Sequence, residues 1–172
     1  MLATVKKTTP HTAAPELTRM FEEHHARIYK AAYRITGSAS DAEDVLQNVF
    51  LRLMHREGTE LVGNLGSYLY RAALNTALDL CRARRNKTAP LTEEPATAGD
   101  GEAVEIRGWL RHALGALSPR QAEMFVLRYI EGYDNREIAQ MLETSQAVVA
   151  VSLFRARSQL QKEFRKLAGG AS

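Results

Sequence analysis

The sequence predicts an all-α protein. Apolar residues recur every three or four positions through most of the 172-residue chain, and this spacing is the period of a helix with one apolar side. No segment alternates between apolar and polar residues as a half-buried strand would. A polar stretch with two prolines interrupts the helical pattern near the middle of the chain. Together these features predict two small helical domains joined by a flexible, acidic linker.

The polar stretch sets the expected domain boundaries. Residues 88–105 carry five acidic residues and no base, a composition too polar to pack into a core. A fourth helix is expected to start near Glu102. The expected divisions are a disordered tail at 1–14, an N-terminal domain at 15–86, a flexible acidic linker at 87–104, a C-terminal domain at 105–167 and a tail at 168–172.

The N-terminal domain is expected to form a three-helix bundle. Its helices are expected at about 15–36, 40–55 and 66–85, with a loop at 56–64. Gly37 should end the first helix, because glycine readily adopts the left-handed conformation that follows a helix. Ser40 and Glu43 have the spacing of a capping box for the second helix. On the third helix, the residues expected to face inward are Leu69, Ala72, Ala73, Thr76, Ala77 and Leu80.

The C-terminal domain carries the start and stop signals of a helix-turn-helix. Ser118, followed by a proline and then by Gln121, forms one capping box, and Asp134 with Glu137 forms a second. Gly132 follows an apolar run and suits a left-handed helix end. Two short helices, a tight turn and a third, basic helix are the arrangement that places one helix in a DNA major groove. The sequence therefore predicts a nucleic-acid partner.

Composition excludes several other classes of function. Apolar residues make up 45% and charged residues 25% of the chain, as in soluble globular proteins. The single cysteine, Cys81, rules out an internal disulfide and fits a reducing compartment. No run approaches the ~18 apolar residues of a membrane span. No metal-ligand spacing, phosphate-binding loop or nucleophile motif is present. We therefore expect a cytoplasmic protein without cofactor, metal or enzymatic activity.

Two blocks of the sequence resemble one protein family. The first, FEEHHARIYKAAYRITGSASDAEDVLQNVFLRLM with LGSYLYRAALNTALDLCRARRN, is similar to the promoter-melting domain of bacterial sigma factors of the extracytoplasmic-function type. The second, LSPRQ through VLRYIEGYDNREIAQML to SLFRARSQL, is similar to the same family's second DNA-binding domain. The resemblance spans about Glu16 to Lys166. It implies a region 2-like helical bundle and a region 4-like helix-turn-helix domain.

The outer face of the second helix is polar beyond what the fold requires. Apolar residues between Val45 and Phe50 already supply its inner stripe. The resemblance implies that the outer face docks on the coiled coil of the largest subunit of RNA polymerase. Asp44 and Gln47 match the family's characteristic docking positions and share a face at i and i+3. A solvated face whose acids complement the helix dipole is the alternative. The expected polymerase-binding residues are Asp41, Asp44, Gln47 and Asn48.

The third helix resembles the part of the family that meets the downstream, minus-10 promoter element. Holding an unstacked DNA strand requires aromatic faces and a basic groove. We expect Tyr68 or Leu69 to lie inside the bundle and Tyr70 to lie outside. Asn75 and Asp79, one turn apart, match a polar pair common in the family. The expected minus-10 residues are Tyr70, Arg71, Asn75, Asp79, Arg82, Arg84 and Arg85.

The last helix, at about 145–167, is expected to meet the upstream, minus-35 element. One stripe between Val149 and Leu160 should pack on the domain. The family commonly has lysine where Ala150 stands and arginine where Ser152 stands, so long base-reading side chains are missing from mid-helix. Weaker affinity for isolated upstream DNA follows. The expected minus-35 residues are Ser145, Gln146, Ala147, Ala150, Val151, Arg155 and Arg157.

The resemblance implies a sigma factor that binds core RNA polymerase, recognises two promoter elements and assists DNA melting. Its implied partners are the polymerase, promoter DNA and an anti-sigma factor. Two other functions remain open. One is a helix-turn-helix regulator that acts independently of core polymerase. The other is an interaction module with impaired DNA binding, which Ala150 and Ser152 keep open.

Overall fold

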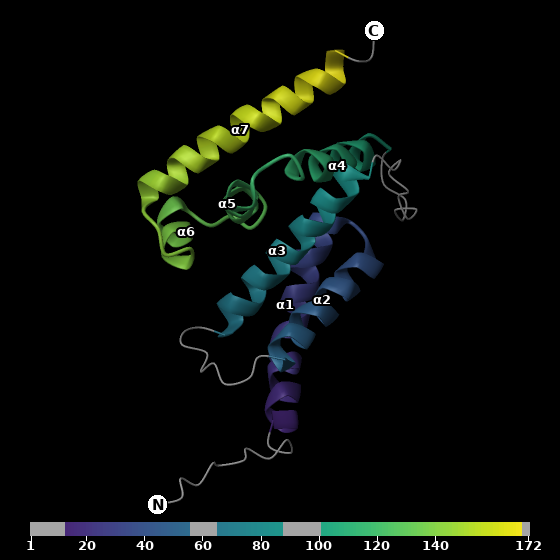
Figure 1. The fold of residues 1–172 in the computed structure, drawn as a ribbon, viewed down its shortest axis with the longest axis vertical. Coiled ribbons are helices and arrows are strands. Elements are labelled where there is room, and N and C mark those ends of the chain that lie inside the picture. Colours follow the sequence, from purple (N-terminus) through teal and green to yellow (C-terminus); the bar gives the residue numbers. More distant parts are fainter. Residues whose placement is uncertain (1–12, 56–64, 88–100, 170–172) are drawn as a thin grey trace, which may run out of the picture.

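The regular structure of the described chain is helical throughout, as expected (Figure 1). The computed structural model describes residues 13–55, 65–87 and 101–169. The predicted 56–64 loop, most of the predicted linker and the chain ends lie outside these residues. Within them the helices are α1 Ala13–Thr36, α2 Ala39–Met54, α3 Leu65–Asn86, α4 Gly101–Leu114, α5 Pro119–Tyr129, α6 Asn135–Met141 and α7 Gln146–Gly169.

Helices α1, α2 and α3 form the N-terminal lobe, in which each packs against the other two. Gly37 ends α1 with φ +66, as expected. The cap of α2 differs from the prediction, because Ser38 rather than Ser40 occupies the N-cap position. Its Oγ accepts a hydrogen bond from the backbone N–H of Asp41 at 3.3 Å. The left-handed Gly37 reverses the chain within one residue, so the next hydroxyl is already placed to cap the new helix.

Helices α4 to α7 form the C-terminal lobe, and the signals read from the sequence are present there. Both predicted capping boxes form, with Ser118 and Asp134 at the N-cap positions. Gly132 has φ +84 beyond the end of α5. Ser145 caps α7, since its Oγ accepts from the backbone N–H of Val148 at 3.2 Å. The helix-turn-helix prediction is confirmed.

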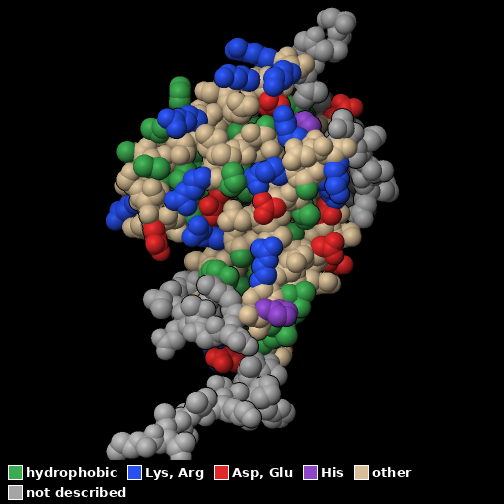
Figure 2. Space-filling view, in the orientation of Figure 1, with side chains coloured by type: hydrophobic (Ala, Val, Ile, Leu, Met, Phe, Trp, Pro, Cys, Tyr) green, Lys and Arg blue, Asp and Glu red, His purple; other side chains and the backbone are tan. Residues whose placement is uncertain are grey.

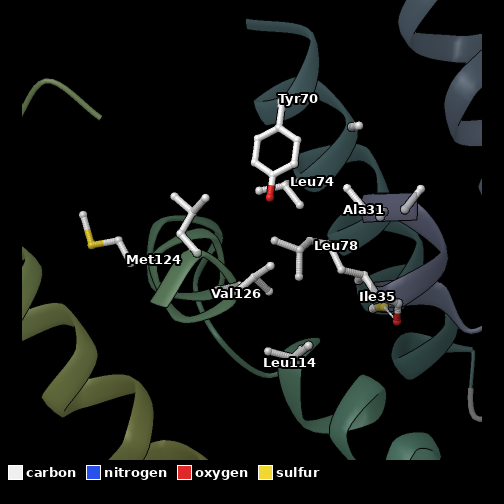
Figure 3. Close-up of a cluster of buried hydrophobic side chains, with 14 of the residues drawn as sticks. Ala31, Ile35, Tyr70, Leu74, Leu78, Leu114, Met124 and Val126 are labelled. Atoms are coloured by element: carbon white, nitrogen blue, oxygen red, sulfur yellow. Dashed lines mark hydrogen bonds between the residues drawn. The ribbon is translucent and has the colours of Figure 1, made fainter. Parts of the chain in front are cut away.

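Helix α3 is buried on two sides and joins the lobes. Its first side packs on α1 and α2, and its second meets α4 and α5. Figure 3 shows Tyr70, Leu74 and Leu78 of α3 directed toward Leu114 and Val126 of the C-terminal lobe. One continuous apolar cluster therefore runs through both lobes. The lobes are in contact, and not only tethered.

The second buried side of α3 corrects part of the sequence prediction. Tyr70 is only 2% exposed, whereas it was expected outside the bundle. Leu69 is buried as predicted, while Tyr68 is exposed. Leu74 and Leu78 were not expected in the core, yet both are buried. The cause is the same for all three misplaced side chains: the C-terminal lobe covers the side of α3 that an isolated bundle would leave in water.

Candidate polymerase and nucleic-acid interfaces

The outer face of α2 presents three of the predicted polymerase-binding residues to solvent. Burial of Val45 and Val49 fixes the rotation of the helix. Asp44, Gln47 and Asn48 consequently lie exposed at i, i+3 and i+4 on one face. The Asn48 side-chain amide donates to the backbone oxygen of Asp44 at 3.1 Å. The structure thus brings these three polar groups together on a surface that the fold does not use.

Asp41 differs from the other three predicted docking residues. Its side chain is only 14% exposed and forms an ion pair with Arg84 of α3. This pair joins a residue expected to contact polymerase with a residue expected to contact DNA. A cationic partner that approached Asp41 would therefore compete with Arg84 for the same carboxylate.

The predicted minus-10 residues of α3 that face the C-terminal lobe are held by its carboxylates. Arg71 Nε donates to Glu123 Oε1 at 3.0 Å, and the Asn75 amide donates to the same oxygen at 3.2 Å. Arg85 Nη2 donates to Glu163 Oε2 at 2.9 Å. Both carboxylates are buried. These three α3 side chains are therefore engaged inside the molecule.

Of the other predicted minus-10 residues on α3, Asp79 and Arg82 lie closer to solvent and Tyr70 is enclosed. Asp79 is exposed and pairs with Arg82 one turn away, at 2.5 Å. Tyr70 is enclosed, with the Arg27 guanidinium 4.4 Å from the centre of its ring. Burial, and next the neighbouring Glu131 carboxylate, raise the pKa of the Tyr70 hydroxyl. In this arrangement the Tyr70 ring cannot stack on a DNA base.

Helix α7 is oriented as the sequence predicts. The stripe at Val149, Leu153, Ala156 and Leu160 is buried, and α7 packs on α5 and α6. The predicted minus-35 residues lie outside this stripe, and all seven of them are exposed. Figure 2 shows Lys and Arg side chains gathered around the C-terminal end of the molecule, near the end of α7. The exposed candidates are Ser145, Gln146, Ala147, Ala150, Val151, Arg155 and Arg157.

Phe154 adds an aromatic group to this face that was not among the predicted contacts. Its side chain is 65% exposed. Together with Arg155 and Lys162 it lines a shallow pocket that reaches Gln121 at the start of α5. An exposed ring beside two cations suits a nucleic-acid backbone or an acidic, partly apolar partner. Its place on the outer face was evident from the helical spacing.

Five residues at the junction of the lobes were not predicted as functional. They are Arg27, Arg34, Glu123, Glu131 and Glu163, and they meet partners 48 to 106 positions away in sequence. No local sequence pattern predicts contacts between residues that are so far apart in the chain. A wide apolar arc on α3 was the one available sign that something covers it.

The described ranges contain no cluster of three or more potential metal-ligating side chains. Among the helices at 13–55, 65–87 and 101–169, none combines the length and apolar character needed to cross a bilayer.

Comparison with known families agrees with this geometry. The family model for Sigma-70 region 2 matches residues 20–87, and the model for Sigma-70, region 4 matches residues 107–160. The first match coincides with the N-terminal lobe and the second with most of the C-terminal lobe. Together they account for both lobes of the structure.

Curated relatives carry the same family name. An "ECF RNA polymerase sigma factor SigE" of Mycolicibacterium smegmatis is 30% identical over 92% of this chain and 65% of its own length. An "RNA polymerase sigma-E factor" of Streptomyces coelicolor is 31% identical over 79% of this chain and 78% of its own. The chain spans only 46% of a SigG protein of Mycobacterium tuberculosis, at 32% identity.

Solved structures share the fold. CnrH, in a complex with the cytosolic domain of CnrY, aligns with a TM-score of 0.53 at 22% identity over 91% of this chain and 89% of its own. The sigma factor RpoE of Bartonella quintana, in a complex with the anti-sigma factor NepR, aligns with a TM-score of 0.51 at 17% identity over 87% of this chain and 97% of its own. With both region models matched in order on two helical lobes, the chain belongs to the extracytoplasmic-function family of RNA polymerase sigma factors.

Proposed function

We propose that this protein binds core RNA polymerase and directs promoter-specific initiation of transcription. The observation that carries the proposal is the outer face of α2, where Asp44, Gln47 and Asn48 lie exposed together while the inner face is buried. This face belongs to a chain that matches both sigma-70 region models. The protein has no catalysis of its own in this proposal and acts in the cytoplasm, where polymerase works.

The docking step is electrostatic and specific in its geometry. An acid and two amides within one helical turn can meet a basic helix together, because residues three and four apart share a face. Their exposure means that docking requires no rearrangement of the α2 backbone. Because docking concentrates both DNA-binding surfaces near the promoter, neither surface has to bind free DNA tightly.

The two lobes then supply the two promoter contacts. The exposed face of α7 from Gln146 to Arg157 reads or holds the upstream element. The basic face of α3, with Arg71, Arg82 and Arg85, holds the downstream strand as it unstacks. The solved structure of RpoE from Bartonella quintana is a complex with an anti-sigma factor, and we propose an anti-sigma factor as a third partner of this chain.

A charge reversal on α2 tests the proposal. The double change Asp44→Arg with Gln47→Arg should abolish co-elution with core polymerase and run-off transcription. It should leave the helical content and urea midpoint unchanged, because both side chains are exposed. Glu22→Arg, an equally exposed reversal on α1, is the matched control and should stay active.

The rival functions give different results in the same assay. A regulator that acts without polymerase would bind its DNA normally and ignore the α2 reversal. An interaction module would support no run-off transcription in any form. Normal transcription by the folded α2 variant would refute docking through this face.

A further inference from the structure

The outer side of α7 carries a ridge of apolar side chains. Ala147, Val151 and Phe154 stand at i, i+4 and i+7, so at about 100° per residue they fall within an arc of roughly 60°. This arc lies opposite the buried stripe that packs on α5 and α6. Val151 is 49% and Phe154 65% exposed, and Ala147 is also exposed. We call these three residues the α7 ridge, which faces solvent along the outer edge of the C-terminal lobe (Figure 1).

The first turns of α7 hold few groups that can hydrogen-bond to a base. Gln146 is the one long polar side chain in the interval from 146 to 154. Ser152, in the same interval, is half-buried. The first cation of the helix, Arg155, lies nine positions beyond Gln146, about 14 Å along the axis at ~1.5 Å per residue. The N-terminal residues of a recognition helix are the ones that reach base edges, so the part of α7 that would enter the groove is mainly apolar.

The turn before α7 holds the ridge in a fixed position. Ser145 Oγ accepts a hydrogen bond from the backbone N–H of Val148 at 3.2 Å. The backbone N–H of Thr144 donates to the backbone oxygen of Ala139 in α6 at 2.9 Å. These bonds fix where α7 begins, and its buried stripe fixes its rotation. Because the ridge is already ordered, contacts with DNA do not have to offset the entropy of ordering it.

Two exposed arginines flank the ridge. Arg155 and Arg157 are two positions apart, so their side chains leave the helix in directions about 160° apart. One therefore lies on each side of the ridge, where the two walls of a DNA groove stand if the ridge points at the groove floor. Guanidinium groups bind phosphate oxygens through charge-assisted hydrogen bonds. Such contacts position the helix but do not read the sequence.

An apolar ridge at the floor of the major groove matches one base. Thymine is the base that presents an apolar group there, its C5 methyl, and alanine and phenylalanine are among the side chains that contact it. Guanine and cytosine present acceptors or a donor instead, and the ridge has no polar side chain to pair with them. Glutamine can bind the adenine of an A·T pair through two hydrogen bonds, and Gln146 stands at the start of α7. The outer face of α7 is therefore complementary to A·T pairs.

We propose that the α7 ridge reads the upstream promoter element through thymine methyl groups. The element recognised by this chain is a short run of A·T pairs, and Ala147, Val151 and Phe154 determine that specificity. The inference rests on the proposed function, because it concerns the promoter contact of the same helix. It deepens that function by naming the class of base sequence and the side chains that select it.

A promoter library supplies the first test. Holoenzyme is reconstituted from the full-length chain and core polymerase, and the library is randomised over both promoter elements. Templates that initiate should be enriched in A·T pairs over about two or three successive upstream positions, the stretch that the N-terminal part of one helix can reach. Enrichment of G·C pairs at the selected upstream positions would overturn the proposal, because the ridge offers no partner for their polar edges.

Replacement of thymine by uracil in the selected upstream element isolates the methyl group. Uracil pairs with adenine as thymine does and lacks only the C5 methyl. In a competition between the two templates for limiting holoenzyme, the uracil template should be used about fourfold less for each methyl in contact with the ridge. The same replacement upstream of the element is the control and should have no effect. The converse change, 5-methylcytosine in place of cytosine at a selected position, should increase use of a C·G template.

Truncation of the ridge tests the protein side of the same contact. Val151→Ala with Phe154→Ala should reduce the preference for thymine over uracil to less than about twofold, because the apolar partners of the methyl groups are gone. The urea midpoint of this variant should stay unchanged, since both side chains are exposed. Ile106→Ala, at an apolar residue of α4 that is 57% exposed, is the matched control and should keep the wild-type preference.

The outcomes separate methyl recognition from the proposed function. Equal use of the thymine and uracil templates by the wild-type chain, or an unchanged preference in the folded ridge variant, would overturn methyl recognition while transcription continues. A holoenzyme that initiates from no library template would instead refute the proposed function. The same library is then presented to the full-length chain alone, and the captured duplexes decide the readout. Enrichment in A·T pairs that is lost on replacement by uracil supports the ridge as a methyl reader, and capture without base preference rejects it.

Discussion

Truncation of Leu74 measures how firmly the C-terminal lobe covers α3. Leu74 is 0% exposed and points toward the junction of the lobes (Figure 3). Leu74→Ala removes three carbon atoms, worth about 2.4 kcal/mol of transfer free energy at ~0.8 kcal/mol per methylene. The cavity left behind brings the expected loss in free energy of unfolding to about 2–5 kcal/mol. If the lobes stood apart, Leu74 would lie in water and its truncation would be nearly neutral.

Urea unfolding followed by far-ultraviolet circular dichroism provides the measurement. Leu69→Ala, on the side of α3 whose burial the sequence predicted, should cost about the same 2–5 kcal/mol. Leu51→Ala, at a residue 49% exposed, should change stability by less than about 0.5 kcal/mol. A Leu74 loss below about 1 kcal/mol beside a full Leu69 loss would refute the shared core. If the free energy of unfolding of the Leu74 variant fell less steeply with urea concentration, its native state would bury less surface than that of wild type.

Three further predictions follow from single side chains. Glu143→Gly should raise the free energy of unfolding by about 0.5 kcal/mol, because Glu143 has φ +50 in the turn before α7; Glu143→Val should lower it in the same urea titration. Lys166 and then Arg85 lower the pKa of Glu163 below its ordinary 4.5. Stability from this carboxylate is therefore complete above pH 4.5 and is lost as pH falls further, so Glu163→Gln should flatten the acid limb of a stability–pH curve. Ala150→Lys should raise the affinity of the full-length chain for upstream promoter DNA and steepen its salt dependence by about one phosphate contact.

The acid limb has a second contributor next to Glu163. Burial, followed by the nearby Arg85, lowers the pKa of His112 from 6.5. A depressed histidine pKa also removes stability as pH falls, beginning below 6.5. The groups that face Glu163 are Arg85 of α3, His112 of α4, and Lys166 and Gln159 of α7. Stability should thus decline in two stages. Glu163→Gln should flatten the lower stage, and it should deepen the upper one, because the Glu163 carboxylate raises the pKa of His112.

Local features were predictable because their causes are local. The capping boxes at Ser118 and Asp134 and the helix end at Gly132 depend on residues within one turn. The inner stripe of α7 follows from helical spacing alone. The exposure of Asp44 and Gln47 also follows, since an apolar stripe on α2 leaves its opposite face in water.

The misplaced side chains have a cause that is not local. Successive residues of an α-helix are rotated by about 100°. Viewed down the axis of α3, the buried side chains therefore occupy an arc of roughly 200°, with Thr76 and Leu69 at one edge and Leu78 at the other. A helix that packs in one bundle usually buries a narrower stripe. The excess arc at Tyr70, Leu74 and Leu78 therefore indicated a second partner. Only the fold shows that this partner is the C-terminal lobe, because Glu123 lies 48 positions beyond Asn75.

The buried apolar surface between the lobes decides how firmly they stay together. Tyr70, Leu74, Leu78, Leu114 and Val126 meet at the junction and are all at most 2% exposed. Fully exposing such side chains costs about 1.5–3 kcal/mol each, so exposing half of this surface costs roughly 4–7 kcal/mol. At 1.4 kcal/mol per factor of ten, fewer than about one chain in a thousand is open unaided. The ion pairs that cross the junction, Arg34–Glu131, Arg71–Glu123 and Arg85–Glu163, adjust that fraction but do not set it.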